Sequence, residues 1–159
     1  MNENGTLHGS KGRYALKFER FFPHNPEDVF HVITNPGYFS QWYPFATGEM
    51  DLRMDGSIAF DDGEGTTYMG TITELERPYL FGFREVDELI NISLQEEDKG
   101  CRMIFTHTFN DDTWAVNTAA GWHRCLDVLV QIVNGKPIKW HDNSAKLRKI
   151  YSEAFNMEY

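Results

Sequence analysis

The order of turn-bounded and helical segments limits the fold of this chain more than any other feature of its sequence. Between residues 48 and 109, Gly, Pro and Asp residues separate short segments of the kind that form antiparallel strands. Beyond Asp112 the apolar residues recur every three or four positions for more than twenty residues, as they do in one long amphipathic helix. A sheet followed by a single long helix predicts an α+β protein built around one core.

The strands are expected to alternate between a buried and an exposed face. Residues 14–22 alternate apolar and polar side chains and predict the first strand. Six more strands are expected at residues 50–54, 57–61, 66–76, 79–85, 88–96 and 101–109, with a two-residue hairpin turn at Asp55-Gly56. In the last strand the alternation places on one face Cys101, Met103, Phe105, His107 and Phe109.

The remaining segments are expected to be helical or flexible. Residues 1–12 have no periodicity and predict a flexible leader. Asn25-Pro26 and Asn35-Pro36 are each typical of the start of a short helix. After the long helix ends at Gly135, residues 136–159 predict a helical extension packed on the same domain. That extension is also a candidate lid, or a contact in a homodimer.

Composition and charge exclude several classes of protein. The chain of 159 residues is 41% hydrophobic and 14% aromatic, which is too apolar for a disordered protein. No apolar run approaches the roughly eighteen residues needed for a membrane span, and no signal peptide is recognisable, so a cytoplasmic location is expected. The net charge is -9, and residues 49–98 hold fourteen acids against three bases. Nucleic acid is therefore not an expected partner.

Three small residues interrupt the middle of the long helix. Ala119, Ala120 and Gly121 occupy successive positions, and Gly costs about 1 kcal/mol relative to Ala inside a helix. Two explanations are open at this point. The helix approaches the sheet closely at that turn, or the small side chains leave a volume that Trp114, Trp122 and aromatic residues of the sheet surround.

An ordered series of segments carries a family resemblance. Trp42 follows a proline-started turn, residues 70–74 precede Pro78, and residues 101–107 form a strand ahead of the Ala-Ala-Gly-Trp sequence at 119–122. Together they resemble the AHSA1-like (activator of Hsp90 ATPase homologue 1-like) family of the START-like, or SRPBCC, helix-grip superfamily, over about residues 13–135. The resemblance implies a curved antiparallel sheet wrapped around a long C-terminal helix, with an internal hydrophobic cavity. Relatives use such cavities for lipids, polyketides, flavonoids and other hydrophobic molecules.

The expected function is therefore binding of a small apolar ligand between the sheet and the long helix. The residues expected to line the cavity are Trp42, Phe60, Tyr68, Phe81, Phe83, Ile92, Phe105, His107, Trp114, Ala119 and Trp122. His107 on an apolar face is interpreted either as a hydrogen-bonded core histidine or as a group that orients a ligand or transfers a proton.

Two alternatives to ligand binding stay open. One is an enzyme of the same fold, with His107 as acid or base and Tyr68 or Arg84 assisting. No catalytic motif or metal-ligand spacing is present, so neither catalytic residues nor a metal or cofactor are expected. The other is a chaperone-interacting protein. Hsp90 activation is not expected, because only a short leader precedes the first strand where the co-chaperone uses a separate amino-terminal domain. Cys101 and Cys125 are expected to be buried, reduced thiols.

Overall fold

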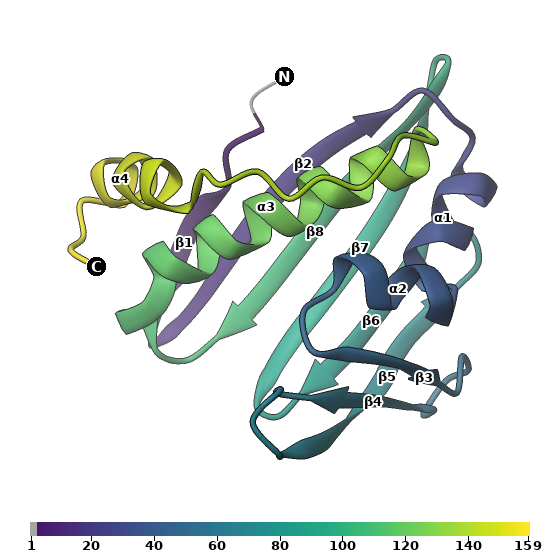
Figure 1. Ribbon diagram of the computed structural model, residues 1–159, viewed down its shortest axis with the longest axis horizontal. Coiled ribbons are helices and arrows are strands. Elements are labelled where there is room, and N and C mark those ends of the chain that lie inside the picture. The colour runs from purple at the N-terminus through teal and green to yellow at the C-terminus, as the bar shows by residue number, and fades with distance from the viewer. Residues whose placement is uncertain (1–2) are drawn as a thin grey trace.

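The computed structural model describes residues 3–159 and has an α+β architecture, in which one antiparallel sheet carries helices on its concave side (Figure 1). The eight strands lie in the order β1-β2-β8-β7-β6-β5-β4-β3. Their bounds are β1 Thr6–Ser10, β2 Arg13–Phe22, β3 Ala46–Met50, β4 Ser57–Asp61, β5 Thr67–Glu76, β6 Leu80–Glu85, β7 Glu88–Glu97 and β8 Gly100–Phe109. The helices are α1 Pro26–Thr34, α2 Pro36–Trp42, the 3-10 turn η1 Asp112–Trp114, α3 Ala115–Val133 and α4 Ser144–Phe155. The predicted α+β class, with one antiparallel sheet and a long C-terminal helix, is confirmed.

The central strands form the floor of the core because their side chains alternate as predicted. Strand β8 buries the five residues that the sequence places on one face and pairs with β2 and β7, so Phe105 lies opposite Phe18 on one side and Ile92 on the other. Helix α3 packs over β2, and α1 contacts β7. Figure 1 shows α3 crossing this half of the sheet while α1 and α2 cover the other half. The core therefore lies between one face of the sheet and the helices that cover it.

The amino-terminal segment differs from the prediction. Thr6–Ser10 form β1, which pairs along its whole length with β2. Lys11 and Gly12 have φ of 53° and 76°, the pair of positive values that a two-residue hairpin turn needs. The Gly5 N–H also donates to Tyr151 Oη at 2.8 Å. The expected flexible leader is therefore wrong for β1, since a Lys-Gly turn and a single inward Leu7 give little sequence signal. Residues 1–2 of that leader lie outside the described residues.

The connection before β4 also differs from the prediction. Strand β3 ends at Met50, whereas residues 50–54 were the expected strand. Residues 51–56 instead form a tight loop, in which Gly56 N–H donates to Arg53 O at 2.9 Å and Asp55 has φ of 64°. A Cβ at Gly56 would lie 1.9 Å from Asp51 O, so the loop requires glycine there. The Asp-Gly pair is thus the end of a longer loop and not a two-residue hairpin turn.

The carboxyl-terminal helix packs on the same core. Helix α4 contacts α3, and the side chains of Leu147 and Tyr151 are buried. The Tyr151 ring packs edge-on against Phe18, with the ring centroids 6.4 Å apart. Between the two helices, residues 134–143 run back along α3, as the yellow-green segment in Figure 1 shows. Tyr151 thereby connects α4 both to the sheet and, through Gly5, to the start of β1.

Both cysteines are free and buried, as predicted. Burial, together with Glu96 and Glu97, raises the pKa of the Cys101 thiol to about 11. Burial raises the pKa of the Cys125 thiol to about 12, against a smaller opposing effect of Arg124. Both thiols are therefore protonated near neutral pH.

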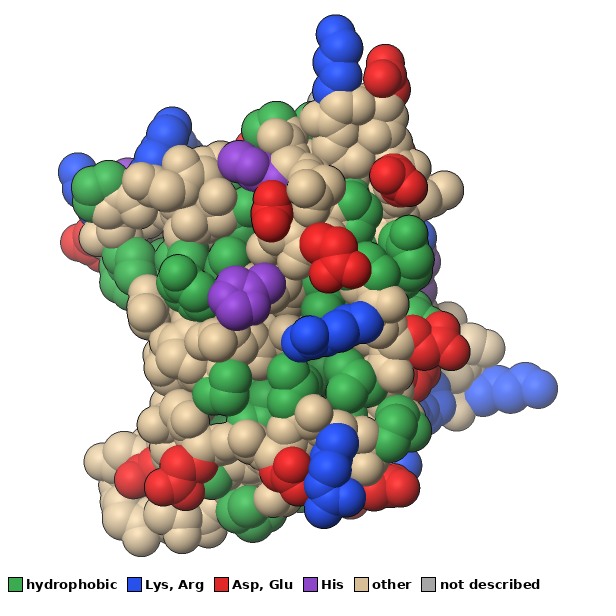
Figure 2. All heavy atoms as spheres, turned by 90° about the vertical axis from the view of Figure 1, so that its right-hand side faces the viewer, with side chains coloured by type: hydrophobic (Ala, Val, Ile, Leu, Met, Phe, Trp, Pro, Cys, Tyr) green, Lys and Arg blue, Asp and Glu red, His purple; other side chains and the backbone are tan. Residues whose placement is uncertain are grey.

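Charge on the molecular surface is mixed. On the face shown in Figure 2, Lys and Arg side chains are scattered among acidic and hydrophobic ones and do not gather into one basic surface. Proteins that bind nucleic acid usually carry a clustered basic surface that contacts the phosphate backbone, and the face in Figure 2 has no such cluster. Within the part of the chain that the structure describes, no helix is both long and apolar enough to cross a bilayer.

Candidate functional site

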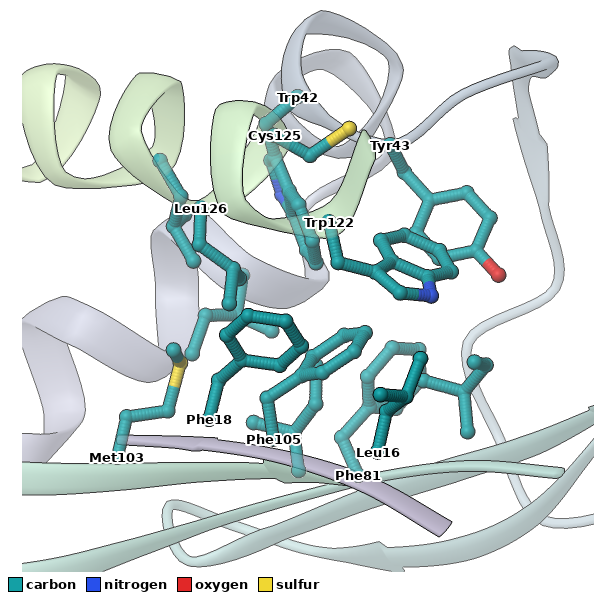
Figure 3. Packing of buried hydrophobic residues seen from close by; sticks show 14 of the residues in the cluster. Leu16, Phe18, Trp42, Tyr43, Phe81, Met103, Phe105, Trp122, Cys125 and Leu126 are labelled. Atoms are coloured by element: carbon teal, nitrogen blue, oxygen red, sulfur yellow. The ribbon is translucent and has the colours of Figure 1, made fainter. Parts of the chain in front are cut away.

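The space between α3 and the sheet is filled by aromatic rings. Trp122 extends from α3 toward the sheet, and its ring centroid lies 4.9 Å from that of Phe105 and 5.2 Å from that of Tyr43 (Figure 3). Tyr43 in turn stacks on Phe39, with the centroids 4.7 Å apart. These contacts hold the end of α2 against the middle of α3.

A pocket of about 650 Å³ lies beside this aromatic cluster, at the edge of α3. It is bounded by the segment that joins α2 to β3, by one side of α3, and by Trp140 from the segment after α3. Its lining residues are Ser40, Gln41, Trp42, Tyr43, Pro44, Phe45, Thr118, Gly121, Trp122, Arg124, Cys125 and Trp140. Phe45 and Trp140 are 53% and 45% exposed, so part of the lining of the pocket lies at the molecular surface. We call it the aromatic pocket.

The small residues of α3 serve two different purposes. Ala119 and Ala120 are buried and pack in the core. Gly121 is exposed and lines the aromatic pocket, and a Cβ built on it would meet no heavy atom within 4 Å. Close approach to the sheet therefore does not explain Gly121. Its missing side chain instead leaves the wall of the pocket open.

The structure distributes the eleven expected cavity residues over several places. Trp42 and Trp122 line the aromatic pocket. The residues buried in the core are Phe60, Phe81, Phe83, Ile92, Phe105 and Ala119. Tyr68 is half-buried, and His107 lines a second, smaller pocket. Trp114 is 65% exposed and lines neither, which corrects the expectation for that residue. It precedes α3 in the turn η1, so the helical stripe that placed it inward begins only at Ala115.

The second pocket has a volume of about 190 Å³ and a polar wall, and we call it the polar pocket. Its lining residues are Tyr43, Pro44, Phe45, Glu85, Val86, Glu88, His107 and Trp122, four of which also line the aromatic pocket. Segment 43–45 and Trp122 are therefore common to both.

His107 is held by two hydrogen bonds at the polar pocket. Trp122 Nε1–H donates to His107 Nδ1 at 2.9 Å, and His107 Nε2 lies 2.5 Å from Glu88 Oε1. Because Nδ1 accepts, a neutral ring carries its proton on Nε2 and donates it to Glu88. Both ring nitrogens are thus engaged, which matches the interpretation of His107 as a hydrogen-bonded core histidine.

Glu85 is held by two phenols at the other side of the polar pocket. Tyr43 Oη donates to Glu85 Oε2 at 2.5 Å, and Tyr68 Oη donates to Oε1 at 2.9 Å. Burial and the neighbouring Glu85 carboxylate raise the pKa of Tyr43 well above its usual value, and the same two causes raise that of Tyr68. Both phenols therefore stay protonated and act as donors that fix the carboxylate.

Phe45 adopts a backbone conformation that is rare for a bulky residue. Its φ is 65°, and its carbonyl accepts the Asp61 N–H at 2.8 Å, which ties the strained residue to β4. Strain of this kind concentrates at functional segments of a chain. Sequence reasoning did not identify Phe45, because no residue pattern marks a left-handed phenylalanine. It also missed Trp140, which reaches the pocket through the path of residues 134–143, and Arg124, whose guanidinium contacts that segment.

Comparison with known proteins agrees with this architecture. The family described as "Activator of Hsp90 ATPase homolog 1-like protein" matches residues 23–134, which is most of the chain. The chain belongs to this AHSA1-like family. The match includes α2, the segment that follows it and all of α3, so most of the aromatic pocket lies within the family region. Trp140 lies beyond it. No curated protein matches the chain.

Solved structures share the fold at low sequence identity. A conserved protein of unknown function from Enterococcus faecalis has a TM-score of 0.83 and 19% identity, over 98% of this chain and 92% of that one. CalU16 from Micromonospora echinospora has a TM-score of 0.74 and 19% identity, over 96% of each chain. The Aha1 dimer from Colwellia psychrerythraea has a TM-score of 0.63 and 15% identity, over 75% of this chain and 95% of that one. At such identities the likeness establishes the fold of this AHSA1-like chain alone.

Proposed function

We propose that the protein binds a small, largely apolar ligand in the aromatic pocket. The observation that carries the proposal is the open wall at Gly121, which faces a space of about 650 Å³ bounded by aromatic side chains. Sites for small organic molecules are concave, mostly apolar and about 300–1,000 Å³ in volume. The AHSA1-like and helix-grip fold, which commonly binds hydrophobic ligands, supports the same function.

The shape of the wall favours a ligand with a planar ring system. Phe45, Trp122 and Trp140 come from three separate segments, and all three aromatic residues line the same space. Aromatic rings gain about 0.5–1.5 kcal/mol beyond area burial when they stack or meet edge-on. Among lipid-, polyketide- and flavonoid-like ligands, the two ring-containing classes fit this wall better than a straight acyl chain.

Binding is the better proposal than catalysis. Both nitrogens of His107 are already hydrogen-bonded, so proton abstraction would first have to break its contact with Trp122 or Glu88. Arg84, one of the two residues expected to assist His107 in catalysis, is exposed and lines neither pocket. If a substrate is found, full turnover by a His107→Ala variant would exclude the acid–base role for that residue.

Fluorescence titration with the neutral apolar dye N-phenyl-1-naphthylamine tests the proposal. The wild-type protein is expected to bind the dye. A Cβ at Gly121 meets no heavy atom within 4 Å, so Gly121→Leu is expected to extend into the open wall and weaken binding about tenfold or more while the fold is retained. Asn117→Leu adds a similar side chain on α3 outside the pocket lining and is the matched control. Equal affinity of the wild type and Gly121→Leu would overturn the proposal.

Macromolecular partners and location stay predictions. The dimer from Colwellia psychrerythraea is a property of that protein, and a homodimer of this chain is tested by sedimentation equilibrium. We do not propose Hsp90 as a partner. Specific retention of Hsp90 by the immobilised protein would place chaperone interaction above ligand binding. The cytoplasmic location is tested by fractionation.

A further inference from the structure

Arg124 is the single charged residue among those that line the aromatic pocket. The chain has 24 acidic against 15 basic Lys and Arg residues, yet none of the lining residues comes from the acidic region 49–98. Among residues 3–159, no carboxylate lies within ion-pair distance of Arg124, although several other arginines are paired. The pocket thus combines aromatic walls with one uncompensated positive charge.

The guanidinium of Arg124 is oriented by two contacts. Nε donates to the His141 carbonyl oxygen at 3.2 Å, and the guanidinium carbon lies 5.6 Å from the centroid of the Trp140 ring. In the part of the chain that the structure describes, neither terminal nitrogen makes a hydrogen bond. Those two nitrogens carry the donors of a planar fork that matches the two oxygens of a carboxylate.

We propose that the ligand of the aromatic pocket is an aromatic carboxylic acid whose carboxylate binds Arg124. This inference rests on the proposed function and names the chemical class of its ligand. Gly121 and Arg124 are three residues apart on α3, a spacing that places neighbouring positions about 5–6 Å apart on one helix face. A ring that lies over Gly121 can therefore extend its carboxylate to the guanidinium.

The polar pocket fixes the direction in which such a ligand lies. Glu85 and Glu88 line that pocket, which adjoins the aromatic pocket through segment 43–45 and Trp122. A carboxylate directed toward the polar pocket would meet two like charges, whereas beside Gly121 it meets Arg124. Like-charge repulsion and ion pairing thus favour the same orientation.

Competition against N-phenyl-1-naphthylamine with two ligands of similar shape tests the proposal. 2-Naphthoate carries the carboxylate, and 2-naphthamide is its neutral counterpart. The wild type is expected to prefer 2-naphthoate by about tenfold, the effect expected of a charge-assisted pair at a partly exposed site, and added salt is expected to reduce the preference. Equal affinity for the two ligands in the wild type would overturn the proposal.

Variants locate the charge that is responsible. Arg124→Gln is expected to abolish the preference for 2-naphthoate while 2-naphthamide and the dye still bind. Arg124→Lys retains the charge without the fork and is expected to show an intermediate preference. Lys136→Gln removes a cation outside the pocket lining and is the control. An unchanged preference in Arg124→Gln would overturn the assignment to Arg124.

The experiment distinguishes failure of the ligand-binding proposal from failure of the inference about the carboxylate. If the wild type binds neither the dye, nor 2-naphthamide, nor 2-naphthoate, the ligand-binding function itself is wrong. If the dye and 2-naphthamide bind but the carboxylate brings no advantage, the aromatic pocket is a binding site and only the inference about the acid group is wrong.

Discussion

The indole N–H of Trp122 donates to Nδ1 of His107 at 2.9 Å and so connects α3 to β8. This hydrogen bond is buried between the aromatic pocket and the polar pocket, whose walls both include Trp122. It selects the tautomer of His107 and, through it, the hydrogen bond to Glu88. The Trp122 ring is therefore held by this hydrogen bond as well as by its ring contacts with Phe105 and Tyr43.

Trp122→Phe removes that contact and leaves Nδ1 of His107 buried without a donor. We expect the free energy of unfolding to fall by about 1–3 kcal/mol for the unpaired group, with a further loss from the smaller ring. Urea denaturation measures the change. Trp114→Phe is the matched control, because Trp114 is 65% exposed and its replacement should change stability by less than about 0.5 kcal/mol. A Trp122→Phe protein as stable as the control would contradict the structural role of the hydrogen bond.

Tyr151→Phe tests the connection between α4 and the first strand. The hydroxyl of Tyr151 accepts the buried Gly5 N–H at 2.8 Å and lies 2.8 Å from His123 Nδ1. Removal of the hydroxyl is expected to lower the free energy of unfolding by about 1–3 kcal/mol. Relative to the wild type, it is expected to raise the hydrogen-exchange rates of β1 amides more than those of β8 amides. Tyr79→Phe, at an exposed position, serves as the control. Unchanged protection of β1 would show that the hydroxyl does not hold that strand.

His123 makes stability depend on pH in a defined direction. Burial lowers the pKa of His123 below its usual 6.5, and Arg20 acts in the same sense, while Asp127 and Glu3 oppose the shift. Since the unfolded chain then binds the proton more tightly, this contribution is present above about pH 6.5 and is lost as the pH falls toward the folded-state pKa.

The wild type is therefore expected to lose more stability than His123→Gln between pH 7 and pH 5, as measured by urea titrations at each pH. The variant still contains the same carboxylates, so the difference between the two curves isolates the histidine. His8→Gln, at an exposed site in β1, should follow the wild-type curve. Parallel curves for the wild type and His123→Gln would refute the linkage.

Phe45 allows pocket binding to be separated from folding. Phe45→Gly removes a wall of the aromatic pocket but relieves a φ of 65°, so we expect weaker binding of N-phenyl-1-naphthylamine without a comparable loss of stability. Phe45→Ala removes the same ring and keeps the Cβ in the left-handed conformation. It should be less stable than Phe45→Gly by about 1–2 kcal/mol. Dye affinity and thermal unfolding of the two variants are the measurements, and equal stability would argue against backbone strain at this residue.

The sequence predicts those parts of the fold that have a regular period. The alternation in β8 and the three- and four-residue spacing of α3 repeat often enough to identify both elements and their buried faces. Strand β1 has one inward apolar residue and a Lys-Gly turn, and Gly5 before it is hydrogen-bonded to Tyr151, a residue 146 positions away. Such a contact leaves no local pattern in the sequence.

The candidate site was predictable only in part for the same reason. Trp42 and Trp122 belong to helices with clear start signals or periods, and both line the aromatic pocket. Trp140 meets Arg124 there because the chain after α3 turns back along that helix, and Phe45 comes from the segment between α2 and β3. Trp114 was misplaced because a helical period was extended one residue before the helix begins.

The aromatic pocket is lined by two kinds of segment: the family domain, which also forms the core, and the segment after α3 that contains Trp140. Its inner wall is built from residues that also maintain the core, so substitutions there endanger folding. Its outer wall includes Trp140, which belongs to residues 135–143, a segment with no helix or strand that lies outside the region matched by the family. Under the proposed ligand-binding function, exchange of that short segment is expected to alter ligand choice while the domain beneath it stays intact.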